Sequence, residues 1–299
     1  MTFIHTFNSE PMLKNIFGYM GEWLETVRAN IIDYTYSAYC IKNIPGCRIV
    51  LYADPAGAEI LSHIPYDEVH VLNDFHSDAR FAASIKFEAI KHMTKDDVLI
   101  DGDLFIQKPE CIKIIESYDK YDFIYSFFEP NQFIMGPKRE RADRYEKLVN
   151  QLAKKHYLFT HPYELPVSID DIRWPNTSFM KFNNMDLKKK YTEQYMKFKQ
   201  GLSDLVFENI WPDLIIEQFH MGRLLQTGGY KSKAMIEDFP SAKSNNYAVS
   251  IGFTHLGGPK RLYTSFFAEQ LKQRFGEKVL EQANEQINKW GHEKLHNGK

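Results

Sequence analysis

The sequence has few cysteines, and their spacing matches no paired motif. Cys40, Cys47 and Cys111 are the three cysteines among its 299 residues. Their odd number and irregular spacing argue against a cysteine-based zinc site and against a disulfide framework. We therefore predict packed thiols in a protein of a reducing compartment.

The sequence also lacks an excess of one charge and a long apolar run. Its 37 basic and 39 acidic residues give a net charge of -2, so no basic surplus favours nucleic acid as a partner. No stretch reaches the roughly 18 apolar residues of a membrane span, and the start "MTFIHTFNSE" has no basic leader. P-loop and dinucleotide-binding glycine motifs are absent. These features predict a soluble cytoplasmic protein.

Apolar runs of strand length alternate with helical patterns along most of the chain. Strands are expected at 3–7, 47–53, 68–72, 98–100, 121–128 and 177–182, and a last strand in 248–261 runs into a glycine-rich turn. Helices are expected at 22–44, 79–93, 138–155, 186–200 and 213–226. This order predicts an α/β domain over residues 1–262 with a mostly parallel sheet. Residues 263–299 carry an apolar stripe that predicts one amphipathic helix packed on the domain.

Two acids separated by a glycine follow the buried strand expected at 98–100. Ligands of open α/β sheets collect beyond the carboxyl ends of strands, and alternate residues point the same way, so Asp101 and Asp103 can face one ion. Gly102 between them lets a ligand approach the backbone closely. Paired oxygen ligands suit Mg²⁺ or Mn²⁺. The alternative is a solvated turn whose acids cap the next segment.

Three later segments carry further polar side chains. Asn176 stands before the strand expected at 177–182, and Asn183 follows it. Glu217 and Gln218 are adjacent within an otherwise apolar helix. The segment "THLGGPK" combines an imidazole, two glycines and a lysine that suit a phosphate-bearing ligand: His255, Gly257, Gly258 and Lys260.

The order of these motifs resembles that of glycosyltransferases with the GT-A fold, in particular the retaining group of glycogenin and the bacterial lipopolysaccharide galactosyltransferases (glycosyltransferase family eight). The resemblance extends from about residue 80 to residue 260. Ser178 stands where that group has glycine, and Glu217 where it has aspartate. The final turn is one residue shorter, and Arg261 replaces a proline.

The resemblance implies a metal-dependent, retaining hexosyltransferase that uses a nucleotide-diphosphate sugar, with a UDP-sugar favoured. The implied metal ligands are Asp101, Asp103 and His255, and the nitrogen ligand favours Mn²⁺ over Mg²⁺. Gln218 and Glu217 are the candidates at the sugar. The implied donor-binding residues are Lys260, Gly257, Gly258, Asn176, Lys86, Arg80 and Gly102. The acceptor, a glycan or a lipid-linked sugar, is not identified.

A glycan-binding or nucleotide-sugar-binding protein that keeps the transferase fold without turnover is the alternative function. Two of the departures from the group's pattern, Ser178 and Glu217, favour it. A phosphatase of the haloacid-dehalogenase kind is disfavoured, because it would carry the paired acids on its first strand and a threonine where this chain has Phe105. Peripheral membrane contact through the helix expected at 263–299 is also disfavoured.

Overall fold

A computed structural model describes residues 1–13, 23–75, 81–128, 174–202, 217–218, 220–237, 239, 241–256 and 260–297. The strands are β1 (Thr2–Phe7), β2 (Arg48–Ala53), β3 (Glu68–Val71), β4 (Asp97–Ile100), β5 (Leu104–Ile106), β6 (Phe123–Tyr125), β7 (Phe179–Phe182), β8 (Ser232–Ala234) and β9 (Phe253–His255). The helices are α1 (Ser9–Leu13), α2 (Trp23–Lys42), α3 (Pro55–Ile60), α4 (Ser84–His92), α5 (Pro109–Ser117), α7 (Met185–Leu202), α9 (His220–Thr227), α10 (Ala242–Ile251), α11 (Thr264–Phe275) and α12 (Glu277–Asn297), with a 3₁₀ turn η5 (Lys260–Leu262).

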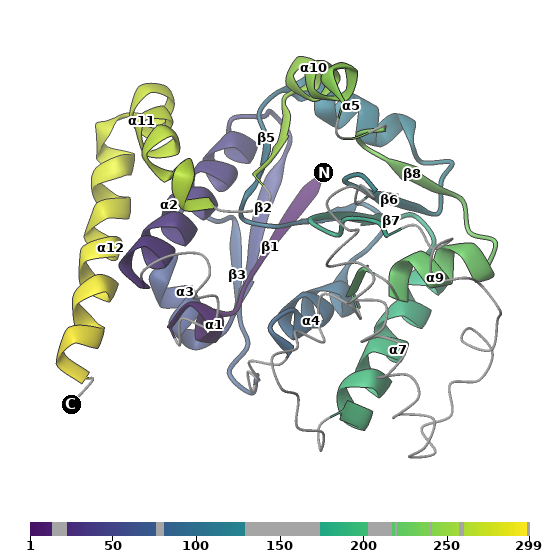
Figure 1. The fold of residues 1–299 in the computed structure, drawn as a ribbon, viewed down its shortest axis with the longest axis horizontal. Coiled ribbons are helices and arrows are strands. Elements are labelled where there is room, and N and C mark those ends of the chain that lie inside the picture. Colours follow the sequence, from purple (N-terminus) through teal and green to yellow (C-terminus); the bar gives the residue numbers. More distant parts are fainter. Residues whose placement is uncertain are drawn as a thin grey trace.

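Seven of the described strands form one sheet in the order β3-β2-β1-β4-β7-β6-β8 (Figure 1). Strands β3, β2, β1 and β4 are parallel, β8 is parallel to β6, and β7 is antiparallel to both of its neighbours. The predicted α/β class with a mostly parallel central sheet is therefore confirmed.

The strand order places a topological switch point between β1 and β4. The chain passes from β1 to β2 on one side, whereas β4 joins β1 from the other side. Open α/β sheets bind ligands in the crevice beyond the carboxyl ends of the strands at such a point. Asp101 is the first residue after β4, so the fold brings the paired acids to this position.

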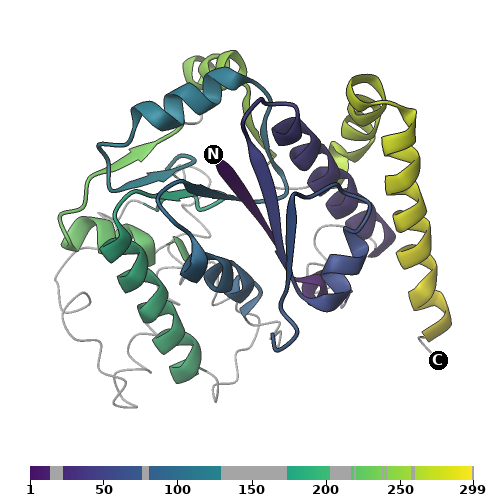
Figure 2. The ribbon, with the colours of Figure 1, turned by 180° about the vertical axis from the view of Figure 1, so that it is seen from behind.

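Helices cover both faces of the sheet (Figures 1 and 2). Because side chains alternate along a strand, Phe3 and Phe7 of β1 join the core beneath α2, α11 and α12, whereas Ile4 joins the core beneath α4, α7 and α9. Both cores are rich in aromatic side chains, and Phe87 of α4 stacks on Tyr195 of α7. The edge that carries Asp101 is thus fixed by packing on two sides.

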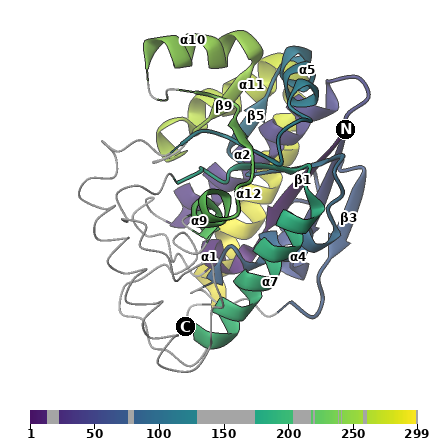
Figure 3. The ribbon, with the colours of Figure 1, turned by 90° about the vertical axis from the view of Figure 1, so that its right-hand side faces the viewer.

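The strand expected within 248–261 is shorter than predicted. Ala248 to Ile251 form the last turn of α10, which begins with a capping box between Ser241 and Ser244. Gly252 ends the helix in the left-handed region with a φ of 70°. Only Phe253–His255 are extended, and β9 pairs with β5 close to α10 instead of joining the main sheet (Figure 3).

The C-terminal segment forms two helices, where the apolar stripe predicts one. Gly276 has a φ of 99° and separates α11 from α12, since this backbone conformation is unfavourable for other residues. The stripe nevertheless packs beside α2 in one core: Phe267, Leu271, Val279, Ala283, Ile287 and Trp290. None of the described helices has the length and apolar character needed to cross a membrane.

The helix expected at 138–155 lies outside the residues that the structure describes. The three cysteines are described and are free thiols, with Cys40 and Cys111 buried.

Candidate functional site

Asp101 lies at the end of β4 in a network of three charges. The Lys86 ammonium, on α4, is 2.7 Å from Asp101 Oδ1 and 2.8 Å from Glu217 Oε1. The Glu217 carboxylate is 2% exposed and the Tyr191 hydroxyl donates to its backbone carbonyl at 3.0 Å. Lys86 therefore joins two predicted site residues that are 116 positions apart in the chain, and its donor-binding role stays a prediction.

Asp103 forms the centre of a second group of charges. Lys260 Nζ is 3.1 Å and His255 Nε2 is 3.7 Å from Asp103 Oδ2. The pairing of β5 with β9 creates this contact, because Leu104 lies opposite His255 and the Leu256 amide donates to the Asp103 carbonyl at 3.1 Å. The structure thus brings together Asp103, His255 and Lys260, which the sequence alone placed in two distant segments.

Asp33 on α2 is a site residue that the sequence reasoning missed. It is 1% exposed, and neither of its carboxylate oxygens has a hydrogen-bond partner among the residues that the structure describes. Burial raises its pKa well above the ordinary value, while the nearby Lys260 acts in the opposite direction. An acid inside the apolar run of an expected helix was the available signal, and the same signal identified Glu217.

The other pKa shifts follow from burial and from the two lysines. Burial alone would raise the pKa of Asp103, but Lys260 and His255 lower it to about 2. Burial raises the pKa of Glu217 despite the opposing effect of Lys86. For Lys86 and Lys260 the order is reversed: burial favours the neutral amine, but the adjacent carboxylates raise both pKa values above the ordinary one. Both lysines are therefore charged at neutral pH.

Asn176 shapes the backbone beside Asp101. Its Oδ1 accepts hydrogen bonds from the Ser178 amide at 3.1 Å and the Ser178 hydroxyl at 2.5 Å. The Ser178 carbonyl in turn accepts from the Asp101 amide at 2.8 Å. Ser178, which stands where the resembled group has glycine, is thus used within this turn. Asn183 is not part of the site, because β7 runs antiparallel to β4 and therefore ends at the opposite edge of the sheet. There the Asn183 side chain donates a hydrogen bond to the Tyr121 carbonyl at 2.8 Å.

Gly102 is explained by packing against Tyr34. A Cβ at this position would lie 2.3 Å from the Tyr34 ring, and the Tyr34 hydroxyl is fixed by a 2.6 Å hydrogen bond to the Thr6 carbonyl. The ring of Tyr34 occupies the space that a larger side chain would need. Close approach of a ligand to Gly102 stays a prediction.

The donor groups present fit a divalent cation in part. Asp103 Oδ1 is a buried oxygen that has no hydrogen-bond partner among the described residues. The His255 imidazole provides a nitrogen 3.7 Å from the other oxygen of the same carboxylate. Asp101 is turned to Lys86. Among the residues that the structure describes, no three His, Cys, Asp or Glu side chains are arranged to hold a metal ion. A cation at Asp103 that also took Asp101 Oδ1 as a ligand would compete with Lys86 for that oxygen.

The remaining predicted site residues are placed less completely. Gln218 is 7% exposed and directly follows Glu217 at the site. Arg80, Gly257 and Gly258 lie outside the described residues, so their donor-binding roles stay predictions.

Two solved structures illustrate what the chain is similar to. The glycosyltransferase GlyE of Streptococcus pneumoniae TIGR4 is 10% identical with a TM-score of 0.39; the match covers 98% of this chain and 64% of GlyE, so the chain spans less than two thirds of that protein. The galactosyltransferase LgtC, crystallised with donor and acceptor sugar analogs, is 10% identical with a TM-score of 0.45, and the match covers 91% of this chain and 96% of LgtC.

No protein-family model and no curated protein matches the chain at the level of sequence. The two similar structures are both glycosyltransferases, as are the proteins that the motif order resembles. Their identities and TM-scores are low, so we base the functional proposal on the residues of the site.

Proposed function

We propose that this protein is a metal-dependent, retaining glycosyltransferase that transfers a hexose from a nucleotide-diphosphate sugar, a UDP-sugar in the favoured case, to a glycan or lipid-linked acceptor. One observation supports this above others: two carboxylates, an imidazole and two partly buried lysines meet beyond the carboxyl end of β4, at the switch point of the sheet. Together they can bind a cation and a diphosphate.

Asp103 and His255 are the residues that would hold the cation, joined by Asp101. A divalent cation bound there would neutralise the charge that grows on the diphosphate as the anomeric bond breaks. The imidazole nitrogen favours Mn²⁺ over Mg²⁺. The low pKa of Asp103 keeps its carboxylate ionised, and therefore able to bind a cation, at every pH above about 2.

Lys260 is the proposed phosphate ligand. Its ammonium now pairs with Asp103, and it is charged at neutral pH. A cation on Asp103 would compete with this pair, which would leave Lys260 available for the phosphate oxygens. Anions are favoured at such a position because a buried ammonium interacts strongly in a medium of low dielectric.

Gln218 and Glu217 are the proposed residues at the sugar. Glu217 is bound by Lys86, so we assign it an action through that lysine, whereas the Gln218 amide contacts the sugar itself. An amide dipole close to the anomeric carbon stabilises developing positive charge without being protonated. Retention then requires attack from the face of the leaving phosphate or a covalent intermediate.

The first experiment is a panel of nucleotide sugars scored by thermal stabilisation with and without Mn²⁺, because ligand binding to the native state raises its apparent stability. Stabilisation by one donor that depends on Mn²⁺, followed by sugar transfer with retained anomeric configuration in NMR, is the expected result. Binding without hydrolysis or transfer across an acceptor screen would instead favour the binding-protein alternative.

Substitution of Lys260 tests the phosphate assignment. Lys260→Ala is expected to weaken nucleoside diphosphate binding at least tenfold, at about 1.4 kcal/mol per tenfold, and to leave nucleoside binding unchanged. Lys243→Ala, an exposed lysine on α10, is the matched control. Equal losses for nucleoside and nucleoside diphosphate would remove Lys260 from this role.

A further inference from the structure

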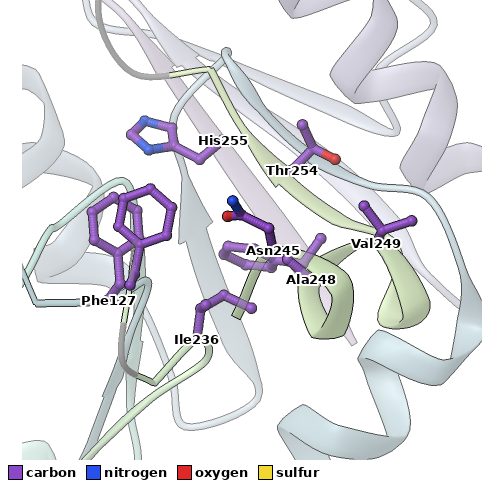
Figure 4. Close-up of a pocket in the computed structure, with 9 residues that line it drawn as sticks. Phe127, Ile236, Asn245, Ala248, Val249, Thr254 and His255 are labelled. Carbon is purple, nitrogen blue, oxygen red and sulfur yellow. The ribbon is translucent and has the colours of Figure 1, made fainter. Parts of the chain in front are cut away.

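A pocket lies beside His255, which is one of its lining residues. It has a volume of about 200 Å³ and is bounded by α10, β9 and the segments that follow β6 and β8 (Figure 4). Six of its lining residues are apolar: Phe127, Ile236, Phe239, Ala248, Val249 and Phe253. Of the site residues described above, His255 is the one that also appears among the described lining residues of the pocket.

The aromatic wall of the pocket connects it to the candidate site. The rings of Phe127 and Phe239 lie 4.3 Å apart between centroids, and the His255 ring is 5.7 Å from that of Phe127. The same His255 ring is 3.7 Å from Asp103. His255 is therefore shared by the wall of the pocket and by the place where we put the cation.

The mostly apolar lining of the pocket favours an apolar ligand. Among the lining residues that the structure describes there is no Asp, Glu, Lys or Arg, and Figure 4 shows Asn245 reaching from α10 into the space between Ile236 and His255. Thr254 and His255 are the other polar side chains among the described residues that line it. A nucleobase would bring several buried donors and acceptors, and most would be left unpaired at a cost of about 1–3 kcal/mol each.

The size of the pocket suits one ring. A cavity of about 150 Å³ with apolar walls binds benzene, so the volume of about 200 Å³ here accommodates a single six-membered aromatic ring with a small substituent. Aromatic rings also gain from tilted contacts with other rings, such as those of Phe127 and Phe239. Val249, 69% exposed, leaves the mouth of the pocket open to solvent.

We propose that this pocket binds the aromatic aglycone of the acceptor, so that the acceptor is a glycoside whose sugar lies beside His255 and Asp103. The proposal rests on the proposed function, since an acceptor is meaningful only for a transferase. The binding of the ring itself depends on neither the metal nor the nucleotide, and this independence allows a separate test.

The test compares phenyl β-D-glucopyranoside with methyl β-D-glucopyranoside in calorimetric titrations of the full chain, without nucleotide or metal. Burial of the ring should make the phenyl glycoside bind about tenfold to a hundredfold more tightly than the methyl glycoside. Equal affinities would overturn the proposal. A ring preference in a protein that binds no nucleotide sugar would refute the transferase function and keep the pocket as an aromatic-binding site.

Variants of α10 locate the binding. Ala248→Trp fills the pocket and should abolish the preference for the phenyl glycoside; Val249→Trp, at the exposed mouth, is a second blocking variant if the first fails to fold. Asn246→Trp places the same side chain at an exposed position of α10 that does not line the pocket, and it should keep the preference. A preference that persists in both folded blocking variants would show that the ring binds elsewhere and would overturn the assignment.

Discussion

The two halves of the charged site differ in how completely their carboxylates are bonded. In the half around Lys86, the ammonium lies 2.7 Å from Asp101 and 2.8 Å from Glu217. In the half around Lys260, one Asp103 oxygen is 3.1 Å from the ammonium, but within the described part of the chain the other Asp103 oxygen and both Asp33 oxygens have no hydrogen-bond partner. A buried polar atom without a partner costs about 1–3 kcal/mol, so the second half retains capacity for a ligand.

The comparison separates a structural role from a binding role. A buried lysine shared by two acids holds α4, β4 and the segment at Glu217 together, because loss of one partner of a buried ion pair leaves the other charge uncompensated. Among the described residues, Lys260 pairs with one carboxylate where Lys86 pairs with two, and some carboxylate oxygens around Lys260 have no hydrogen-bond partner. We therefore expect substitution of Lys86 to affect mainly stability and substitutions around Lys260 to affect mainly ligand binding.

The largest expected effect is the loss of metal-dependent binding when Asp103 is replaced. Asp103→Asn removes the charge and keeps the shape, so Mn²⁺-dependent binding of a nucleoside diphosphate should become undetectable in calorimetric titration while the fold persists. The control is Asp96→Asn, an exposed acid before β4. An Asp103→Asn protein that titrates like the wild type would place the cation elsewhere.

The next effect concerns turnover and not affinity. Gln218→Ala should reduce donor hydrolysis or transfer by roughly ten- to a thousandfold, the range for loss of one group that stabilises the transition state. Nucleoside diphosphate binding should stay unchanged, because the amide acts at the sugar. Gln226→Ala, an exposed glutamine on α9, is the matched control. Parallel losses in rate and in nucleotide affinity would contradict this assignment.

The third effect tests the comparison through stability. Lys86→Met leaves Asp101 and Glu217 without their shared cation and should lower the free energy of unfolding by about 3 kcal/mol. Asp33→Asn removes an acid that has no hydrogen-bond partner, so it should leave the free energy of unfolding unchanged or raise it by up to about 1 kcal/mol. Urea unfolding measures both.

Lys91→Met, in an exposed pair with Glu88 on the same helix as Lys86, controls for loss of a surface lysine and should cost below about 1 kcal/mol. If Lys86→Met and Asp33→Asn destabilise equally, the two halves of the site do not differ in the way that we propose.

The sequence predicted those parts of the fold and of the candidate site that local sequence patterns encode. The apolar run of β4 followed by Asp101 and Asp103 showed where a strand ends in an α/β sheet, and the motif order supplied Glu217, His255 and Lys260. The α/β class followed from the alternation of strand and helix patterns, because apolar periodicity reflects burial on each element.

The pairing of distant segments could not be predicted in this way. That β9 pairs with β5 and sets His255 beside Asp103 depends on contacts across about 150 positions, which no local pattern records. The segment from Ala248 to Ile251 was predicted as strand because most of its residues are apolar. A capping box between Ser241 and Ser244 instead starts a helix that extends to Ile251. Asp33 was missed because an acid within a helix is ordinarily exposed, and only the packing of α2 shows that it is buried.

The smallest expected effect is a pH dependence of stability that comes from two buried histidines, each linked to one half of the site through a neighbouring side chain. His5 Nε2 bonds the Ser37 hydroxyl at 3.0 Å, and that hydroxyl donates to the carbonyl of Leu104, the residue after Asp103, at 2.6 Å. His220 stacks on Tyr191, whose hydroxyl donates to the Glu217 carbonyl. Burial lowers the pKa of each histidine to about 3, so both are neutral in the folded protein at neutral pH.

Acid should therefore destabilise both halves through these side chains. Each folded pKa lies below the unfolded value of about 6.5, so the unfolded state takes up the proton first and stability falls as the pH drops from 6.5 towards 3. At pH 5 each histidine should cost about 2 kcal/mol relative to pH 7. Urea unfolding of His5→Gln and of His220→Gln at both pH values should show this acid-linked loss reduced by about that amount in each variant. If only one variant shows a reduced pH dependence, only that half of the site depends on a neutral histidine.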